Sequence, residues 1–331
     1  LTIRTNAYQD KISFLSSNPV ASKYHPYIMN ADGTGITKLM ELVDLKALKM
    51  EPLNWGVDLS GKVVYSISPN CGRIAFAQGQ VKGNGIGGPW AIYVMDMTSR
   101  KLKKIVWDER DNFCMPRWSP DGDKLLFLRA SPLGRESICI ANADGTGLKE
   151  VLRGRALHSP DWSPDGRKIA FFGALDGVWS IYTMDLETGA LRNITRGKIT
   201  FPFVTHLAVL RWSPGGKRIA FGDGRDIYVI NSDGTNLRKL TNSEGRIVNV
   251  FPCWSPEGVS IAFTRNEGGV FHIYVMSPSG ARLRRLTDNE MEEAYGIDWR
   301  SSLGVGLERK PLFRRTLWGG IKLWALKGDK P

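Results

Sequence analysis

The sequence predicts an all-β fold, a six-bladed β-propeller whose last blade is closed by one C-terminal strand plus three N-terminal strands. Three observations predict it. A phrase such as DWSPDGRKIAF, at 161–171, recurs along the chain. A second phrase such as IYVI with a DGT turn follows most copies. The two ends of the chain hold complementary fragments of one repeat. Repeats of this length with several short strands are typical of propeller blades.

The first phrase supplies two strands and the turn between them. Four copies carry a tryptophan nine positions before a phenylalanine, and a fifth copy has Ile67 before Phe76. In the intervening SPDG sequence, Pro favours a φ of about −65° and Gly accepts a positive φ, so the chain reverses there. We call the two strands A and B. The pairs are Trp118 with Phe127, Trp162 with Phe171, Trp212 with Phe221 and Trp254 with Phe263.

The second phrase supplies strands C and D. A tyrosine stands nine positions before an apolar residue in four copies, and a glycine-containing turn lies between them. The pairs are Tyr93 with Leu102, Tyr182 with Leu191, Tyr228 with Leu237 and Tyr274 with Leu283, while Cys139 and Leu148 fill the same positions. Anchors at 67, 118, 162, 212, 254 and 299 recur every 42 to 51 residues. They predict six blades of four antiparallel strands.

The N-terminus begins in the middle of a repeat. KISFLSS places Phe14 at the phenylalanine position, and Tyr27 and Ile36 are again nine apart. The missing tryptophan half reappears near the other end as GIDWRSS, with Trp299. We expect these fragments to form one blade that closes the ring. Residues 1–306 are therefore assigned to the propeller.

Residues 307–331 form a basic, aromatic tail outside the repeat. The tail has seven Lys or Arg against two acidic residues and contains Trp318 and Trp324. Two interpretations remain open. The tail packs as a strap on the rim of the propeller, or it is a segment that docks on a partner or a membrane surface.

The tryptophans at the anchor positions are expected to be structural. Each would wedge between neighbouring blades and bury a large apolar surface. One position earlier stand Arg117, Asp161, Arg211 and Asp298. We interpret these as a ring of charges between blades, in which solvent in the channel keeps each ion pair weak.

Composition excludes several functional classes. The net charge of +12 predicts attraction to anions. No nucleic-acid-binding motif accompanies the charge, so nucleic acid is not the expected partner. The sequence contains no run of 18 apolar residues, so no transmembrane span is predicted. Cys71, Cys114, Cys139 and Cys253 have no CxxC spacing, so no metal site is predicted.

A glycine motif in the first complete repeat resembles a nucleotide-binding sequence. Gly83, Gly85 and Gly88 have GxGxxG spacing. A dinucleotide site needs a helix after the glycines, and a strand is predicted here instead. The sequence therefore predicts no cofactor, and we expect a monomer.

The ordered motifs WSPDG, IAF, IYVM, DGT and LT resemble the TolB-like propeller family over residues 11 to about 301. The resemblance implies a six-bladed propeller and a periplasmic or otherwise exported protein. No signal peptide is visible in this sequence, and Leu1 is not a start methionine. Similar repeats also occur in peptidases and polysaccharide lyases, so the fold does not define the chemistry.

Loop variability indicates where binding takes place. The A–B and C–D turns are short and repetitive, whereas the B–C and D–A loops vary and share the opposite face. Variable loops on a rigid scaffold usually carry function. We therefore expect this variable face to bind a protein or an acidic polysaccharide without catalysis. The candidate binding residues are Arg110, Arg153, Arg155, Tyr24, Trp90, Trp179 and Phe271.

The alternative is a polysaccharide lyase or glycoside hydrolase acting at the central funnel. A proton-abstracting side chain beside a cation that neutralises a uronate would suit such chemistry. The candidates in the D–A loops are His158, His206, Arg155 and Tyr295. No HExxH or GxSxG motif supports a specific enzyme class.

Overall fold

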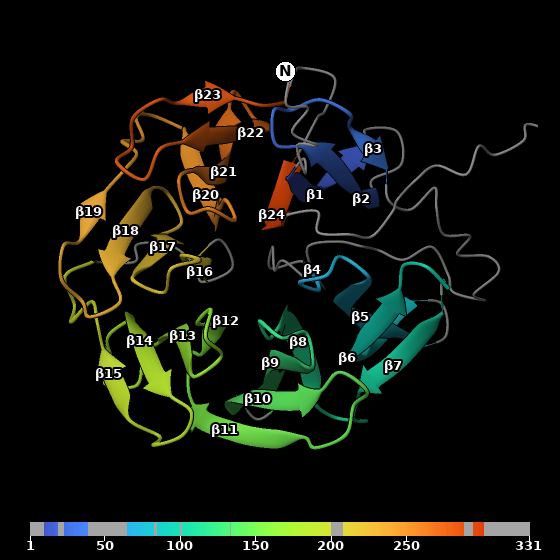
Figure 1. Cartoon of the computed structure of the whole chain (residues 1–331). Helices are drawn as coiled ribbons and strands as arrows, with labels where there is room; N and C mark the ends of the chain where they lie inside the picture. Colours follow the sequence, from blue (N-terminus) through green and yellow to red (C-terminus); the bar gives the residue numbers. More distant parts are fainter. Residues whose placement is uncertain are drawn as a thin grey trace, which may run out of the picture.

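A computed structural model describes residues 10–18, 23–38, 65–82, 85–99, 101–132, 134–199, 208–287 and 294–300. In these ranges the chain forms six four-stranded antiparallel sheets around a common axis (Figure 1). The all-β, six-bladed prediction is confirmed. None of the described segments is a helix long and apolar enough to cross a membrane.

Five blades follow one another directly along the chain, each with strand A nearest the axis. Blade 1 contains β4 (Tyr65–Ile67), β5 (Arg73–Lys82), β6 (Gly85–Asp96) and β7 (Leu102–Val106). Blade 2 contains β8 (Asn112–Trp118), β9 (Lys124–Ala130), β10 (Glu136–Asn142) and β11 (Lys149–Gly154). Blade 3 contains β12 (His158–Trp162), β13 (Lys168–Gly173), β14 (Ser180–Asp185) and β15 (Leu191–Asn193).

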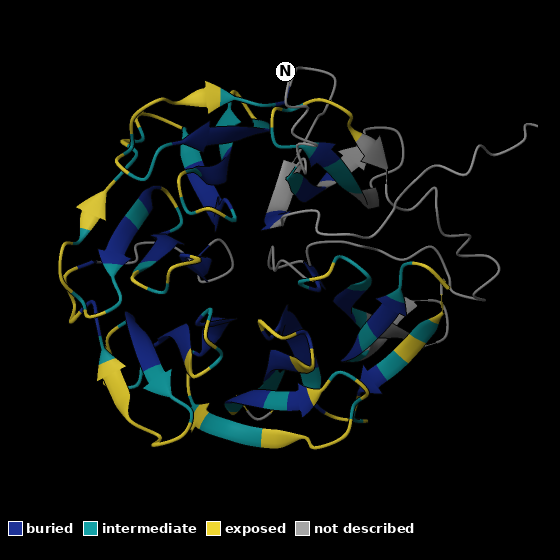
Figure 2. Ribbon diagram, viewed as in Figure 1, coloured by how far each residue is buried: buried dark blue, intermediate teal, exposed yellow. Residues whose placement is uncertain are grey.

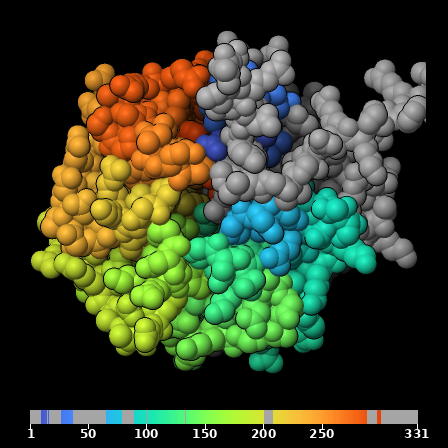
Figure 3. Space-filling view, viewed as in Figure 1, coloured from blue at the N-terminus to red at the C-terminus, as the bar shows by residue number. Residues whose placement is uncertain are grey.

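The next two blades repeat the pattern with shorter outer strands. Blade 4 contains β16 (Leu210–Trp212), β17 (Arg218–Gly222), β18 (Ile227–Asn231) and β19 (Arg238–Lys239). Blade 5 contains β20 (Val248–Trp254), β21 (Ile261–Glu267), β22 (Val270–Met276) and β23 (Arg284–Arg285). In the space-filling view, the colours of successive blades follow one another around the disc (Figure 3).

Blade 6 joins the two ends of the described chain. Its inner strand is β24 (Ala294–Arg300), which pairs with β1 (Lys11–Asn18) so that Trp299 lies opposite Ile12. The N-terminal segment adds β2 (Lys23–Asn30) and β3 (Thr37–Lys38). The predicted closure by one C-terminal and three N-terminal strands is therefore confirmed.

The core lies between blades rather than in one central cluster. All five anchor tryptophans are buried, and the most exposed of them, Trp212, is 9% exposed. This burial confirms their structural assignment. The repeated phenylalanine and tyrosine stack across strands B and C, as Phe171 and Tyr182 do with ring centroids 5.7 Å apart. The same Phe–Tyr pair is therefore stacked at the corresponding positions of several blades.

The outer strands of the blades carry many of the exposed residues (Figure 2). Exposed cations on these edges include Lys103, Lys149, Arg192, Arg238, Lys239 and Arg284. Charged side chains on an edge strand oppose pairing with another chain. The exposed cations of these outer strands therefore have a structural explanation.

The glycine motif of blade 1 is not a nucleotide site of the dinucleotide-binding type. Gly85 and Gly88 both lie in β6, and this strand pairs with β5. The prediction that a strand follows the first glycine is confirmed.

The DGT turns between strands C and D are held by their aspartates. In each turn Asp32, Asp144 or Asp233 accepts hydrogen bonds from the backbone N–H and the hydroxyl of the threonine two positions later. These bonds favour the ionised carboxylate and lower the pKa of all three aspartates below the ordinary value of 3.8.

We therefore expect the melting temperature to fall as the pH drops below about 4. A folded-state pKa below the unfolded value adds stability above the unfolded pKa, and this stability is lost as the carboxylate protonates. The triple variant Asp32→Asn, Asp144→Asn, Asp233→Asn keeps the acceptor oxygens but cannot titrate. Circular dichroism melts between about pH 6 and pH 3, which lie on either side of the ordinary Asp pKa of about 3.9, should show a smaller acid loss for this variant. An equal loss in both proteins would contradict the assignment.

Candidate functional site

A ring of side chains lines the axis, one position before each anchor. Its members are Ser66, Arg117, Asp161, Arg211, Cys253 and Asp298, and all are buried. Arg117 Nε lies 3.1 Å from Asp161 Oδ1, and Arg117 Nη1 lies 3.9 Å from Asp298 Oδ2. The side chains of Arg117, Asp161 and Asp298 are at most 10% exposed, so these pairs are more buried than a solvent-filled channel would leave them. The assignment of the ring to inter-blade contacts holds.

Three acceptors of the ring each link their own blade to the next. Asp161 Oδ2 accepts the backbone N–H of Trp212 at 3.0 Å, and Asp298 Oδ2 accepts that of Ile67 at 3.2 Å. Cys253 Sγ accepts the backbone N–H of Trp299 at 3.2 Å. Both carboxylates are thus held by a backbone N–H as well as by Arg117.

Arg211 differs from Arg117 because no ion pair of its guanidinium is found among the described residues. Its Nη1 donates to the carbonyl of Leu210 at 2.7 Å, and its buried Nε has no hydrogen-bond partner in the described part of the chain. Burial, and then the positive charge of Arg117, lower the pKa of Arg211 to about 10. Arg211 remains a cation at neutral pH, because Asp161 and Asp298 raise its pKa, although by less than burial and Arg117 lower it.

The ring forms the floor of a cavity of about 300 Å³, which we call the channel mouth. Its rim consists of the A–B turns, so it opens on the face of the short turns. The prolines of five of these turns line it: Pro69, Pro120, Pro164, Pro214 and Pro256. The sequence analysis assigned function to the opposite face. It did not identify the proline rim, although the repeated SP sequence was the available signal.

Bulges in three inner strands were also missed. Met115, Ser159 and Phe251 adopt φ values of 46–56°, each three positions before its tryptophan and directly before a proline. A positive φ is strained for these residue types. The side chains link blades, since the N–H of Ser159 donates to Met115 Sδ at 3.3 Å and that of Leu210 donates to Ser159 Oγ at 3.3 Å. The recurring MPRW, SPDW and FPCW sequences were the signal.

The predicted basic residues of the variable face all lie at the protein surface. Arg110, Arg153 and Arg155 are exposed. Arg153 Nε lies 2.9 Å from Glu150 Oε1, and 64% of its side chain is exposed, so this pair stabilises little. Their exposure is what is expected of cations on surface loops.

The predicted aromatic residues are half-buried rather than openly displayed. Trp90 packs against the core between blades 2 and 3, Trp179 against the core of blades 3 and 4, and Phe271 against Val250 and Phe251. Tyr24 lies in β2, but its side chain is outside the described residues. The packing of the three described rings has a structural explanation.

The predicted catalytic group is only partly described. His158 begins β12 and is 4% exposed, whereas Arg155 is exposed. His206 lies outside the described residues, and Tyr295 is placed in β24 opposite Leu15 without a described side chain. Among the residues that the structure describes, no group of three His, Cys, Asp or Glu side chains could hold a metal ion.

Comparison with protein families gives one match that covers most of the chain. The model of the TolB beta propeller domain matches residues 1–202 and 131–297. The uncharacterized protein Atu1656 of Agrobacterium fabrum is 31% identical over 217 residues, which are 63% of this chain and 68% of that protein. The Tol-Pal system protein TolB of Anaeromyxobacter dehalogenans is 30% identical over 118 residues, 34% of this chain and 25% of that protein.

Solved structures show the same fold in proteins of different kinds. TolB from Acinetobacter baumannii has a TM-score of 0.67 at 19% identity, covering 88% of this chain and 66% of that one. A puromycin hydrolase has a TM-score of 0.59 at 15% identity, covering 85% of this chain and 53% of that one. At these identities the likeness establishes the fold alone.

Proposed function

This chain belongs to the TolB β-propeller domain family, and from this premise we propose that it is a non-catalytic binding protein that takes an acidic segment of a partner protein at the channel mouth. Family membership also supports an exported, periplasmic location. The relatives named as TolB include a component of the Tol-Pal system, which supports a protein as the partner.

The observation that carries the proposal is the buried guanidinium of Arg211. A charge taken out of water without a partner is destabilising, and a carboxylate supplied from outside would compensate it. Arg117 cannot be the receptor, because Asp161 and Asp298 already lie beside it. Arg211 is therefore the ring cation that we assign to the carboxylate of an incoming Asp, Glu or chain terminus.

The shape of the channel mouth supports a peptide segment. Its volume of about 300 Å³ suits one or two side chains rather than a folded domain. The proline rim is rigid, so little conformational entropy is lost when a segment binds. The buried floor is dry enough to strengthen a charge-assisted hydrogen bond.

The variable face is the second candidate, for a protein or an acidic glycan. Exposed Arg110 and Arg155 and the 54% exposed Val178 on a B–C loop favour it. Arg153, Trp90, Trp179, Phe271 and Tyr24 would complete that site. The lyase or hydrolase alternative has less support, since the burial of His158 leaves it poorly placed to reach a substrate.

Site-specific photo-crosslinking in cells of the source organism separates the two faces. A photoreactive residue at Pro120 reports on the channel mouth, and one at Val178 reports on the variable face. We expect one protein to be captured from position 120 and not from position 178. Arg211→Met should reduce its capture roughly tenfold or more, because a charge-assisted contact is lost.

The matched control is Lys217→Met, which removes an exposed positive charge from the A–B turn of the same blade. It should leave capture unchanged. Capture only from position 178, or capture that Arg211→Met does not affect, would refute the channel-mouth proposal. The first of these results would instead favour the variable face.

A further inference from the structure

The floor of the channel mouth contains a thiol that the proposed function does not use. Cys253 of β20 stands one position before its tryptophan, where four of the other ring members are charged. It lines the cavity of about 300 Å³ together with Arg211 of the neighbouring blade 4. A small reagent can reach a cysteine at the wall of a cavity more readily than one inside a core.

The other three cysteines have different surroundings. Cys114 and Cys139 lie in hydrophobic cores between blades, are at most 7% exposed and do not line the channel mouth. Burial, and then the charge of Glu150, raise the pKa of Cys139 to about 11, so its thiolate is disfavoured. Cys71 is half-buried on the A–B turn of blade 1. Cys253 therefore differs from the core cysteines by its place at a cavity.

The Sγ atom of Cys253 lies among groups that favour its thiolate. The backbone N–H of Trp299 donates to Sγ at 3.2 Å. A negative charge on Cys253 stabilises the cationic forms of both Arg117 and Arg211. The two ring carboxylates act in the opposite sense, but Arg117 and backbone N–H groups already hold both of them. Cations and N–H donors beside a cysteine promote the thiolate, which is the reactive form.

Arg211 provides independent evidence for a negatively charged ligand beside this thiol. It is 7% exposed, and its Nε has no hydrogen-bond partner in the described part of the chain. Burial, and then the charge of Arg117, lower the pKa of Arg211 to about 10, although Asp161 and Asp298 act in the opposite direction. A negative group next to the thiol would therefore stabilise this buried cation.

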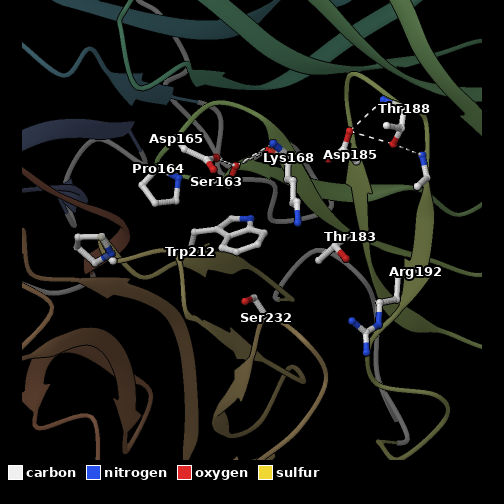
Figure 4. A pocket seen from close by; sticks show the side chains of 14 residues that line it. Ser163, Pro164, Asp165, Lys168, Thr183, Asp185, Thr188, Arg192, Trp212 and Ser232 are labelled. Atoms are coloured by element: carbon white, nitrogen blue, oxygen red, sulfur yellow. Dashed lines mark hydrogen bonds between the residues drawn. The ribbon is translucent and has the colours of Figure 1, made fainter.

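A neighbouring cavity of about 620 Å³ between blades 3 and 4 differs from the channel mouth (Figure 4). The two cavities share Pro164 and Trp212 as lining residues. Two aspartates, one lysine and one arginine line the larger cavity, so its charges balance, and its lining residues include no cysteine. Thiol chemistry is therefore assigned to the smaller cavity.

We propose that Cys253 is a site of thiol–disulfide exchange with small disulfides that carry a carboxylate. The Sγ thiolate attacks one sulfur of the disulfide, a new S–S bond forms as the old one breaks, and the other half leaves as a thiolate. The leaving thiolate takes up the proton that Cys253 lost, so one thiol replaces another and no further oxidant is needed. The carboxylate of the attached half lies beside Arg211. Any control of partner binding by this adduct rests on the proposed function, whereas the exchange reaction does not.

Two small disulfides of similar length test the proposal on the full chain carrying Cys71→Ser, which removes a competing thiol. Dithiodiglycolate carries a carboxylate on each half, and bis(hydroxyethyl) disulfide is neutral. Mass spectrometry with peptide mapping measures the rate at which each forms an adduct on Cys253. Each rate is divided by the rate of the same reagent with N-acetylcysteine amide, a neutral thiol. We expect both reagents to modify Cys253, and the normalised rate of dithiodiglycolate to be roughly tenfold higher or more, because Arg211 attracts its carboxylate.

Variants assign this preference to Arg211. Arg211→Met should remove the preference for dithiodiglycolate, whereas Arg211→Lys keeps a positive charge and should retain it. Lys217→Met removes an exposed positive charge from the A–B turn of the same blade and should leave both rates unchanged. Thermal melts check that each variant is folded. If no adduct forms on Cys253 in the folded protein, if the two normalised rates are equal, or if folded Arg211→Met keeps the preference, the proposal is wrong.

Discussion

A chain that ends at residue 293 is expected to aggregate instead of forming a monomeric propeller. It lacks β24, the inner strand of blade 6, and therefore loses the antiparallel pairing with β1. It also loses Trp299, which packs with Ile12 and Phe14, and Asp298, which accepts the backbone N–H of Ile67 in blade 1. An open ring exposes unpaired sheet edges, and such edges associate between chains.

A chain that ends at residue 306 is the matched control. It keeps β24 and removes only the basic tail, so we expect it to stay monomeric with a melting temperature close to that of the full chain. Size-exclusion chromatography and thermal melts compare the two truncations. A monomeric protein that ends at residue 293 and melts at an unchanged temperature would show that the ring does not depend on this closure.

Trp162→Ala is expected to lower the free energy of unfolding by about 3–5 kcal/mol, as for other buried tryptophans. Trp162 is 7% exposed and lies in the core between blades 2 and 3, with Leu126, Ile169 and Phe171. Its Nε1 donates to the carbonyl of Arg117 at 3.2 Å. The variant thus loses apolar contacts, leaves a cavity and removes an inter-blade hydrogen bond.

Trp107→Ala provides the comparison within the same chain. The Trp107 ring is 54% exposed, and its described aromatic interaction is with Lys104, whose Nζ lies 4.2 Å from the ring centroid. We expect this variant to lose less than about 1 kcal/mol. Chemical denaturation measures both changes. Similar losses for Trp162 and Trp107 would contradict the assignment of Trp162 as an inter-blade wedge.

The sequence by itself determined the architecture of the propeller. The SPDG and DGT turns are local, because Pro, Gly and the turn aspartates act within a few positions of the chain. Alternating apolar residues predict the strands between these turns, and each repeat of the sequence forms the same kind of blade around the ring. The split repeat predicted the closure by β24 and β1, which lie almost the full length of the chain apart.

The sequence also located the charged ring but not its environment. Arg117, Asp161, Arg211 and Asp298 were recognisable from their common position before the anchor. Whether solvent reaches them depends on how closely the inner strands approach, and the structure buries all four. The same packing separates Arg117, which has two carboxylates beside it, from Arg211, for which no ion pair is described.

Only the tertiary structure decided which surfaces are available for binding. The sequence placed His158 in a loop as a candidate catalytic residue, but His158 begins a strand and is buried. Gly215 is one glycine among many in the sequence, and only the structure shows that it lines a cavity between blades 3 and 4. Both outcomes depend on contacts between residues about 40 to 50 positions apart in adjacent blades, one repeat length in this architecture. A pattern within one repeat determines a blade, whereas a cavity is formed by side chains from two or more blades at once.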